Sequence, residues 1–194
     1  MCPRGYFSFS LLALALFLAA GCLAPPLPLS QDGVDLQQGR FLAAYYFAPD
    51  FVPDQVFYHL ESFFLEEAQG VDPDAFRTQF HTALAKAWEA NGLKLAAREN
   101  ACRLAGTVHR VSLRGAFFRF ITGKISADLT VSGSITRNGE VLFAFRDRFS
   151  VSSPVNPGPP VPKEAELLLQ QLCQAFAHRL LNEILLHGLP EGSG

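Results

Sequence analysis

Apolar and polar positions alternate with a period of two over a long stretch of the chain that ends at Thr136. The apolar or small positions are Ile125, Ala127, Leu129, Val131, Gly133 and Ile135, and most residues between them are Ser or Thr. A period of two places successive side chains on opposite faces of a strand. The pattern therefore predicts a half-buried strand with a hydroxyl-rich outer face.

A second alternation follows and predicts the antiparallel partner of this strand. Its apolar positions are Val141, Phe143, Phe145, Phe149 and Val151. A two-residue turn at Asn138-Gly139 would place Arg146 and Arg148 on the apolar side. We therefore predict a three-residue loop over 137–139, with its glycine left-handed in a bulge. In this register Asp128 faces Arg148 and forms a cross-strand ion pair with it.

Three further strands are predicted before this hairpin. Leu104–Leu113 is the strand that precedes it, and Arg114-Gly115 supplies the next turn. Phe41–Phe47 is aromatic and continuous, which indicates a strand buried on both faces. Leu93–Leu95 starts a short edge strand.

Three segments have apolar residues at helical spacing. Over Asp54–Glu67 this spacing predicts a short amphipathic helix, which either packs on the domain or binds a membrane or partner. A stronger helix has Asp72 as its N-cap, Pro73 at its first position and Asn91-Gly92 as its stop. The last helix, Lys163–His187, has a wide apolar face.

Together these elements predict an α+β fold. We expect a two-layer sandwich in which an antiparallel sheet of about four strands carries two long helices packed on one face. Five prolines between 153 and 162 end the sheet and carry the chain across to the last helix. Residues 40–190 are expected to form the single α+β domain, because their number suits one hydrophobic core.

The N-terminus predicts export. Arg4 is followed by an apolar run, Leu11–Ala20, that is too short to span a bilayer core of about 30 Å as a helix. The motif Leu18-Ala19-Ala20-Gly21-Cys22 resembles the lipobox of bacterial lipoproteins. This resemblance implies that Cys22 is the lipidated first residue of the mature protein. A plain signal peptide with an incidental cysteine is the alternative.

The lipobox divides the N-terminal region into two parts. Residues 1–21 are expected to be the signal peptide, and residues 22–39 the lipidated N-terminus and a tether that contains Pro and Gly. Cys22 is followed by Leu23 and not by Asp, which resembles the outer-membrane sorting pattern of enteric lipoproteins. The expected location is therefore the outer membrane, with a lipid anchor and a domain that faces the periplasm.

Charge and cysteine usage narrow the function classes. A formal net charge of -2 gives no basic excess to neutralise phosphates, so no nucleic-acid partner is expected. Cys102 and Cys173 are the cysteines left in the predicted domain. They either pair as a disulfide in an oxidising periplasm or are both small buried hydrophobes, and spacing does not decide between the two. Neither lies in a CxxC motif.

The sequence contains no motif that predicts catalysis. GxSxG, HExxH and a Walker-type loop are all missing from it. Its five histidines are scattered over different predicted elements and are interpreted as surface or helix-packing residues: His59, His81, His109, His178 and His187. We therefore expect no catalytic site, no metal site and no cofactor, and we predict that the chain is not an enzyme.

One cluster of cations is a candidate ligand or partner site. Arg110, Ser112 and Arg114 share one face of a predicted strand by the period of two. Further cations lie in adjoining segments, and these are Arg119, Lys124, Arg146 and Arg148. Arginine pairs bidentately with phosphate, and nearby phenylalanines suit acyl chains, so a phosphorylated amphiphile fits this cluster. The alternative is a solvated sheet face whose charges prevent edge aggregation.

The order of the predicted elements resembles the small two-layer lipoproteins of Gram-negative outer membranes, which include the LPS-assembly lipoprotein family. The most similar part is Phe76–Ser134. In it, Asn91-Gly92-Leu93-Lys94-Leu95 ends a helix, and the strand segments Arg103–Val108 and Ser126–Val131 follow.

This resemblance implies a function. The chain would be a non-catalytic, periplasm-facing outer-membrane lipoprotein that acts as an accessory in envelope assembly or transport. Its partners would be the membrane, through the lipid anchor, and an outer-membrane β-barrel or envelope transport complex, with LPS or phospholipid as a ligand. The alternative is a lipid- or glycan-binding periplasmic module without a barrel partner. A hydrolase is a third hypothesis.

Overall fold

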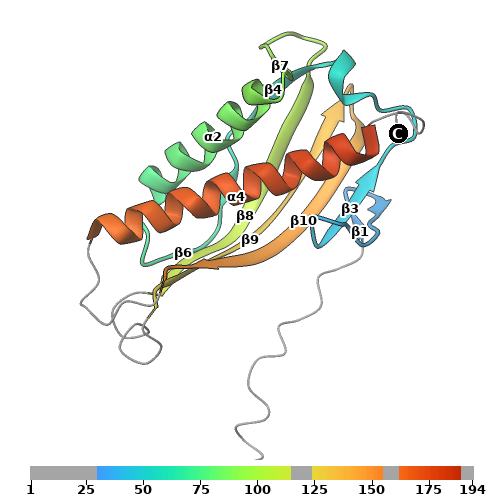
Figure 1. The fold of residues 1–194 in the computed structure, drawn as a ribbon. Coiled ribbons are helices and arrows are strands. Elements are labelled where there is room, and N and C mark those ends of the chain that lie inside the picture. Colours follow the sequence, from blue (N-terminus) through green and yellow to red (C-terminus); the bar gives the residue numbers. More distant parts are fainter. Residues whose placement is uncertain (1–29, 115–123, 155–161, 189–194) are drawn as a thin grey trace, which may run out of the picture.

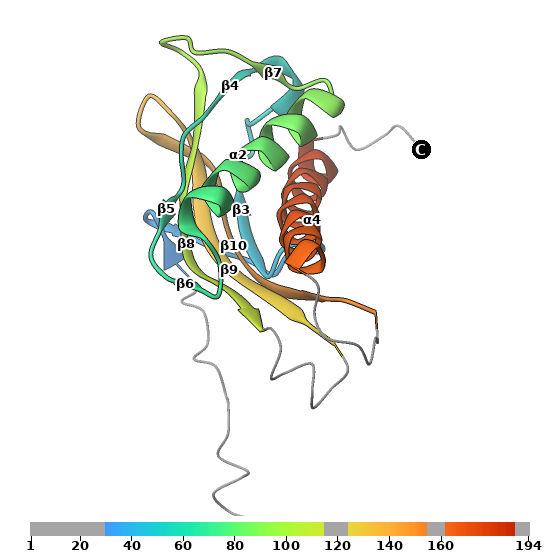
Figure 2. The same cartoon turned by 90° about the vertical axis from the view of Figure 1, so that its left-hand side faces the viewer.

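Two layers make up the part of the chain that the structure describes, which is residues 30–114, 124–154 and 162–188 of a computed structural model. One layer is an open β-sheet, and the other holds helices α2 (Pro73–Ala90) and α4 (Pro162–Gly188). Both helices lie on one face of the sheet (Figures 1 and 2). The predicted α+β class with two long helices on one face is confirmed. No described helix is long and apolar enough to cross a membrane.

The sheet is larger than predicted and contains both pairing directions. Three long antiparallel strands form its centre: β8 (Cys102–Arg114), β9 (Ser126–Arg137) and β10 (Glu140–Ser152). The flanking strands are β3 (Ala44–Phe47) beside β10, then β4 (Phe57–Leu60), β5 (Phe64–Leu65) and β6 (Ala68–Gln69) beside β8, and β7 (Lys94–Leu95) beside β4. Strands β4, β5 and β6 run parallel to β8, and β7 runs parallel to β4. The prediction of an antiparallel sheet of about four strands was therefore wrong, because eight strands of the described residues pair in one mixed sheet.

The helix expected over Asp54–Glu67 was wrong as well. Only η1 (Pro53–Gln55) is helical there, as a short 3₁₀ turn, and the chain then runs along the edge of β8. Tyr58 and Phe63 point into the core, whereas Phe64, which the helical spacing placed on the apolar face, is 65% exposed. Without this segment β8 would present an unpaired edge. Main-chain pairing with β8 therefore outweighs the local helical spacing.

Helix α2 begins and ends where its capping residues predict. The side chain of Asp72 accepts a hydrogen bond from the N–H of Ala75 at 2.7 Å, and Gly92 takes a positive φ of 73° after the last turn. Its buried face meets α4, where the rings of Phe80 and Phe176 stack with centroids 5.1 Å apart. This aromatic contact joins the two helices over the centre of the sheet.

The hairpin between β9 and β10 has a register different from the predicted one. Asn138 and Gly139 both have positive φ, 53° and 84°, as in a two-residue type I′ turn. The register then shifts between Val141 and Phe143, where β10 has a bulge. This bulge brings Phe143 opposite Ile135 on the helix side. The extra residue is therefore in the strand and not in the turn.

Part of the expected tether is folded onto the sheet. Strands β1 (Ser30–Gln31) and β2 (Val34–Asp35) pair as a small hairpin. The side-chain amide of Gln31 donates a hydrogen bond to the carbonyl oxygen of Gly133 on β9, at 3.0 Å. Figure 2 shows this hairpin on the side of the sheet opposite the helices. Residues 1–29, with the expected signal peptide and Cys22, lie outside the described residues.

Two fully buried carboxylates fix the segment that leads into β3. Glu183 of α4 accepts hydrogen bonds from three successive backbone N–H groups, those of residues 40–42, at 2.6–3.1 Å. Asp147 of β10 accepts one from the N–H of Ala43 at 3.1 Å. Both carboxylates have 0% exposure. We call Glu183, Asp147 and the N–H groups of residues 40–43 the carboxylate clamp.

Each carboxylate of the clamp also has a cationic or ring partner. Arg179 of α4 donates two hydrogen bonds to Asp147, at 2.7 and 2.9 Å, in a bidentate ion pair. His187 Nε2 lies 3.1 Å from Glu183 Oε1. Burial alone would raise the pKa of Glu183, but the N–H groups of residues 40–42 and the His187 ring lower that pKa below its ordinary value.

Replacing Glu183 by Gln should lower the free energy of unfolding by about 2–4 kcal/mol at pH 7, because buried N–H groups lose a charged acceptor. A carboxylate with a depressed folded-state pKa stabilises the fold above its unfolded pKa of about 4.3, and this contribution is lost as the pH falls through the folded-state pKa. Urea unfolding at pH 7 and pH 3 should therefore show a smaller acid-induced loss in Glu183→Gln than in the parent. The control is Glu166→Gln, an exposed glutamate on the same helix, which should keep the parent's pH dependence. An unchanged pH dependence in Glu183→Gln would contradict the clamp.

Gly139→Val should lower the free energy of unfolding by more than about 1 kcal/mol, because a β-branched residue resists a positive φ. A Cβ at this position would meet no atom within 4 Å, so the loss comes from the backbone alone. Gly139→Asn is the matched control and should lose less, since Asn tolerates left-handed φ. Thermal unfolding of both variants measures the difference, and equal midpoints would contradict the turn assignment.

Candidate functional site on the helix-free face of the sheet

The face of the sheet that carries no helix is polar along all three central strands. We call it the helix-free face, and Figure 2 shows it on the side opposite α2 and α4. Its side chains include Arg103, Thr107, His109, Arg110, Ser112 and Arg114 of β8, Ser126, Asp128, Thr130, Ser132, Ser134 and Thr136 of β9, and Arg146, Arg148, Ser150 and Ser152 of β10. The hydroxyl-rich outer face predicted for the long strand is β9 at the centre of this surface.

The structure brings four of the six predicted site residues onto this face. Arg110 and Arg114 lie on β8, and Arg146 and Arg148 lie on β10, with β9 between the two pairs. Lys124 precedes β9, and Arg119 lies outside the described residues. The shared face of Arg110, Ser112 and Arg114 is as predicted.

Acidic neighbours engage the two predicted site arginines of β8. Arg114 Nε lies 3.1 Å from Asp128 Oδ2, and Arg110 Nε lies 3.6 Å from Glu67 Oε2. Arg110 also donates to the side-chain oxygen of Gln69 at 2.6 Å. The predicted ion pair between Asp128 and Arg148 was wrong, because the bulge in β10 places Ser150 opposite Asp128.

The two arginines of β10 differ in their contacts. Arg146 Nε donates to the side-chain oxygen of Gln31, in the N-terminal hairpin, at 3.3 Å. Arg148 is exposed and has no ion pair with any residue that the structure describes. Arg148 therefore offers positive charge to an incoming group at the β10 side of the helix-free face, while Arg110 and Arg114 on the β8 side are paired with acidic side chains.

His109 on β8 contacts β9 and the segment between β5 and β6, which the sequence did not predict. Its Nδ1 lies 2.9 Å from Glu66 Oε2, and its Nε2 lies 2.7 Å from Ser132 Oγ. These residues are 43 and 23 positions away along the chain. No fixed sequence spacing marks such a set, because a bulge in β8 and the register with β9 bring the three side chains together.

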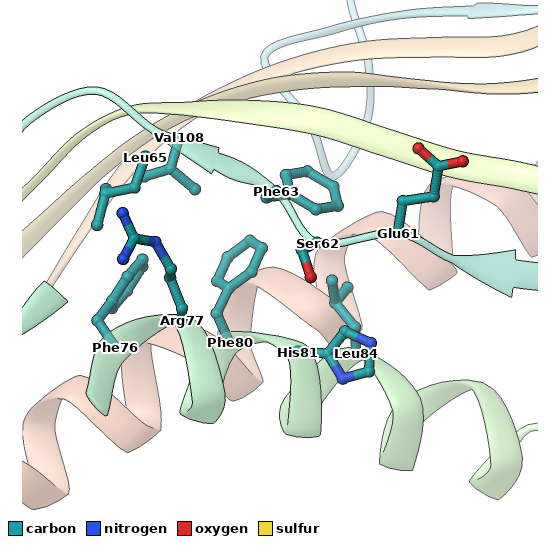
Figure 3. Close-up of a pocket in the computed structure, with 10 residues that line it drawn as sticks. All are labelled: Glu61, Ser62, Phe63, Leu65, Phe76, Arg77, Phe80, His81, Leu84 and Val108. Atoms are coloured by element: carbon teal, nitrogen blue, oxygen red, sulfur yellow. The ribbon is translucent and has the colours of Figure 1, made fainter. Parts of the chain in front are cut away.

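A small cavity lies between helix α2 and the sheet. This cavity, between α2 and the segment before β5, has a volume of about 30 Å³ and is lined mainly by Phe63, Leu65, Phe76, Phe80, Leu84 and Val108 (Figure 3). That volume suits about one water molecule and not an acyl chain.

A larger cavity of about 560 Å³ opens at the end of α4. Its wall includes Phe47, Phe51, Leu185 and His187, together with the prolines and polar residues of the 49–55 segment. The His187 ring stacks on Tyr45, with centroids 4.5 Å apart, and this contact orients the imidazole. The volume is in the range of small-molecule sites.

Cys102 and Cys173 are both buried and free, so the disulfide alternative is not formed in the structure. Burial raises the pKa of each thiol, that of Cys173 to about 12. Such thiols stay protonated at neutral pH and behave as small hydrophobes. Among the described residues, no group of three or more His, Cys, Asp or Glu side chains is arranged to hold a metal ion.

Comparisons with known proteins place lipoproteins among the similar structures. No family model and no curated protein matches the chain. The minor lipoprotein from Acinetobacter baumannii is 17% identical, over 72% of this chain and 98% of its own, with a TM-score of 0.44. The rare lipoprotein B from Shewanella oneidensis is 13% identical, over 66% of this chain and 94% of its own, with a TM-score of 0.42. A DUF330-family protein from Xanthomonas campestris is 12% identical, over 74% of this chain and 92% of its own, with a TM-score of 0.48.

A double-mutant cycle on Arg114 and Asp128 should give a coupling energy of about 0.2–1 kcal/mol, because the pair is partly exposed to solvent. The same cycle on Arg148 and Asp128 should give none within error, since Ser150 faces Asp128. Urea unfolding of the single and double alanine variants measures both cycles. A larger coupling for Arg148 than for Arg114 would contradict the register of β10.

Proposed function

We propose that the protein is a lipid-anchored lipoprotein of the outer membrane that faces the periplasm and acts as an accessory in envelope assembly or transport. Binding of a partner across the helix-free face is the central step of this role. The partner would be an outer-membrane β-barrel or an envelope transport complex, and LPS or phospholipid would be a further ligand.

The observation that carries this proposal is the uneven division of the sheet. Two helices cover one face, whereas the other presents ordered hydroxyls and exposed arginines to solvent over three long strands. A flat polar surface of this kind suits recognition by hydrogen bonds and charge, which gives specificity and fast association more than hydrophobic burial. The lipobox-like motif at Cys22 supports the anchor and the location.

The second candidate function is a lipid- or glycan-binding module without a barrel partner. The cavity of about 560 Å³ at the end of α4 favours it, because this cavity combines aromatic walls with His187. The cavity of about 30 Å³ under α2 gives it no support, since an acyl chain does not fit there.

Charge reversal on the helix-free face tests the first proposal. Tagged full-length parent protein, purified from its own envelope in mild detergent, should retain an outer-membrane barrel or transport complex stoichiometrically. The Arg148→Glu variant should lose most of this partner, because a favourable charge becomes repulsive. Lys86→Glu, an exposed charge reversal on α2, is the matched control and should retain the partner. Mass spectrometry of the bound proteins and lipids is the measurement.

Two outcomes would contradict the first proposal. One is the same retention of the partner by Arg148→Glu and the parent. The other is stoichiometric lipid or glycan without protein, which would support the second candidate instead.

A further inference from the structure

Four polar side chains form a row across neighbouring strands of the helix-free face. Glu66 Oε2 lies 2.9 Å from His109 Nδ1, and His109 Nε2 lies 2.7 Å from Ser132 Oγ. Arg146 is the direct cross-strand neighbour of Ser132 on β10. The row therefore contains a carboxylate, an imidazole, a hydroxyl and a guanidinium in spatial order.

The backbone of the sheet holds each member of this row. Val108 pairs with Val131 and Arg110 with Thr130, so His109 is the extra residue of a bulge in β8. Bulges of this kind re-aim a side chain and are common beside active sites. The N–H of Glu66 donates to the carbonyl oxygen of Val108 at 3.0 Å, which sets the carboxylate beside the imidazole. His109, Ser132 and Arg146 lie on strands, which hold side-chain geometry better than loops do.

The arrangement meets the geometric test for an activated serine. A nucleophile must lie within hydrogen-bond reach of a base, and a third group must orient that base through its other nitrogen. Serine, histidine and carboxylate arranged in this way recur on unrelated folds and are identified by geometry and not by sequence position. The missing GxSxG motif therefore does not exclude this role.

We propose that Ser132 is the nucleophile of an ester-hydrolysing site in which His109 is the general base and Glu66 orients the imidazole. This inference goes beyond the binding role proposed above and departs from the expectation that the chain is not an enzyme. Ser132 Oγ forms a bond to the ester carbonyl carbon while its proton moves to His109 Nε2. The C–O bond of the ester then breaks, and His109 returns the proton to the leaving alcohol.

Water completes the reaction and restores the serine. His109 takes a proton from the water as it attacks the acyl-Ser132 carbonyl carbon, and then returns a proton to Ser132 Oγ as the acid leaves. Negative charge develops on the carbonyl oxygen in both steps, and Arg146, which pairs with Ser132 across the adjacent strand, is the cation that we assign to stabilise it.

The surroundings of Ser132 select the substrate class. The residue is only 8% exposed, so the space above its hydroxyl suits a small acyl group. Its neighbours along β9 on this face are Thr130 and Ser134. We therefore assign a short acyl ester carried by a polar, hydroxylated molecule.

A fluorophosphonate probe tests the nucleophile directly. Its phosphorus forms a bond to Ser132 Oγ, fluoride leaves, and His109 accepts the serine proton. Full-length protein in mild detergent should be labelled at Ser132, as located by mass spectrometry of peptides, and should hydrolyse p-nitrophenyl acetate. His109→Gln should lower the labelling rate at least about 100-fold. Glu66→Gln should lower kcat for p-nitrophenyl acetate and leave KM unchanged.

Thr82→Ala is the matched control, because it removes an exposed hydroxyl of α2, on the other side of the sheet, and should keep the parent's labelling rate. The thermal midpoint of each variant shows that it is folded. Absence of label at Ser132 in folded parent protein, or equal rates in the parent and His109→Gln, would overturn the proposal. Labelling needs no partner protein, so its failure is distinct from a failure of the binding role.

Discussion

The carboxylate clamp is the interaction on which the arrangement of the layers depends. Two buried carboxylates, one on α4 and one on β10, accept four successive backbone N–H groups of residues 40–43. A buried charge without partners would cost several kcal/mol, so these positions tolerate carboxylates only while the segment stays in place. The clamp thereby sets where β3 enters the sheet and how α4 lies across it. The same contacts leave the opposite face open for the polar surface that we interpret as the functional site.

Much of the fold follows from the sequence because its strongest signals are local. The period of two over β9 and the caps at Asp72 and Gly92 describe the chain's own backbone, and the structure agrees with them. The helix predicted around Phe64 was wrong because the secondary structure of this segment is decided by pairing with the edge of β8, which lies far away in the sequence. The predicted register of the β9–β10 hairpin was also wrong. A period of two shows which residues share a face, but a bulge can lie in the turn or in the strand without changing that pattern.

The sequence predicted which arginines belong to the candidate site, but it did not predict which side chains they contact. The arginines of β8 and β10 follow from the period, whereas their acidic neighbours depend on register and on strands that were expected to be helical. His109 was out of reach because the bulge that re-aims it has no sequence signature here. Asp147 and Glu183 did leave a signal, since each is a carboxylate inside an otherwise apolar periodic face. A charge at such a position indicates a buried partner, even when the partner is unknown.

The long sequence separation across the clamp has a consequence for the order of folding. Glu183 lies 141 residues after Leu42, whereas β9 and β10 are joined by a two-residue turn. Contacts between distant residues carry the larger loop-closure entropy and form late, so the central hairpin can assemble well before the clamp closes. A ribosome delivers the N-terminus first, and the clamped segment must then wait for the last helix. The end of the domain nearest its expected membrane anchor is therefore the last to become ordered, and it stays free to move during most of the protein's assembly.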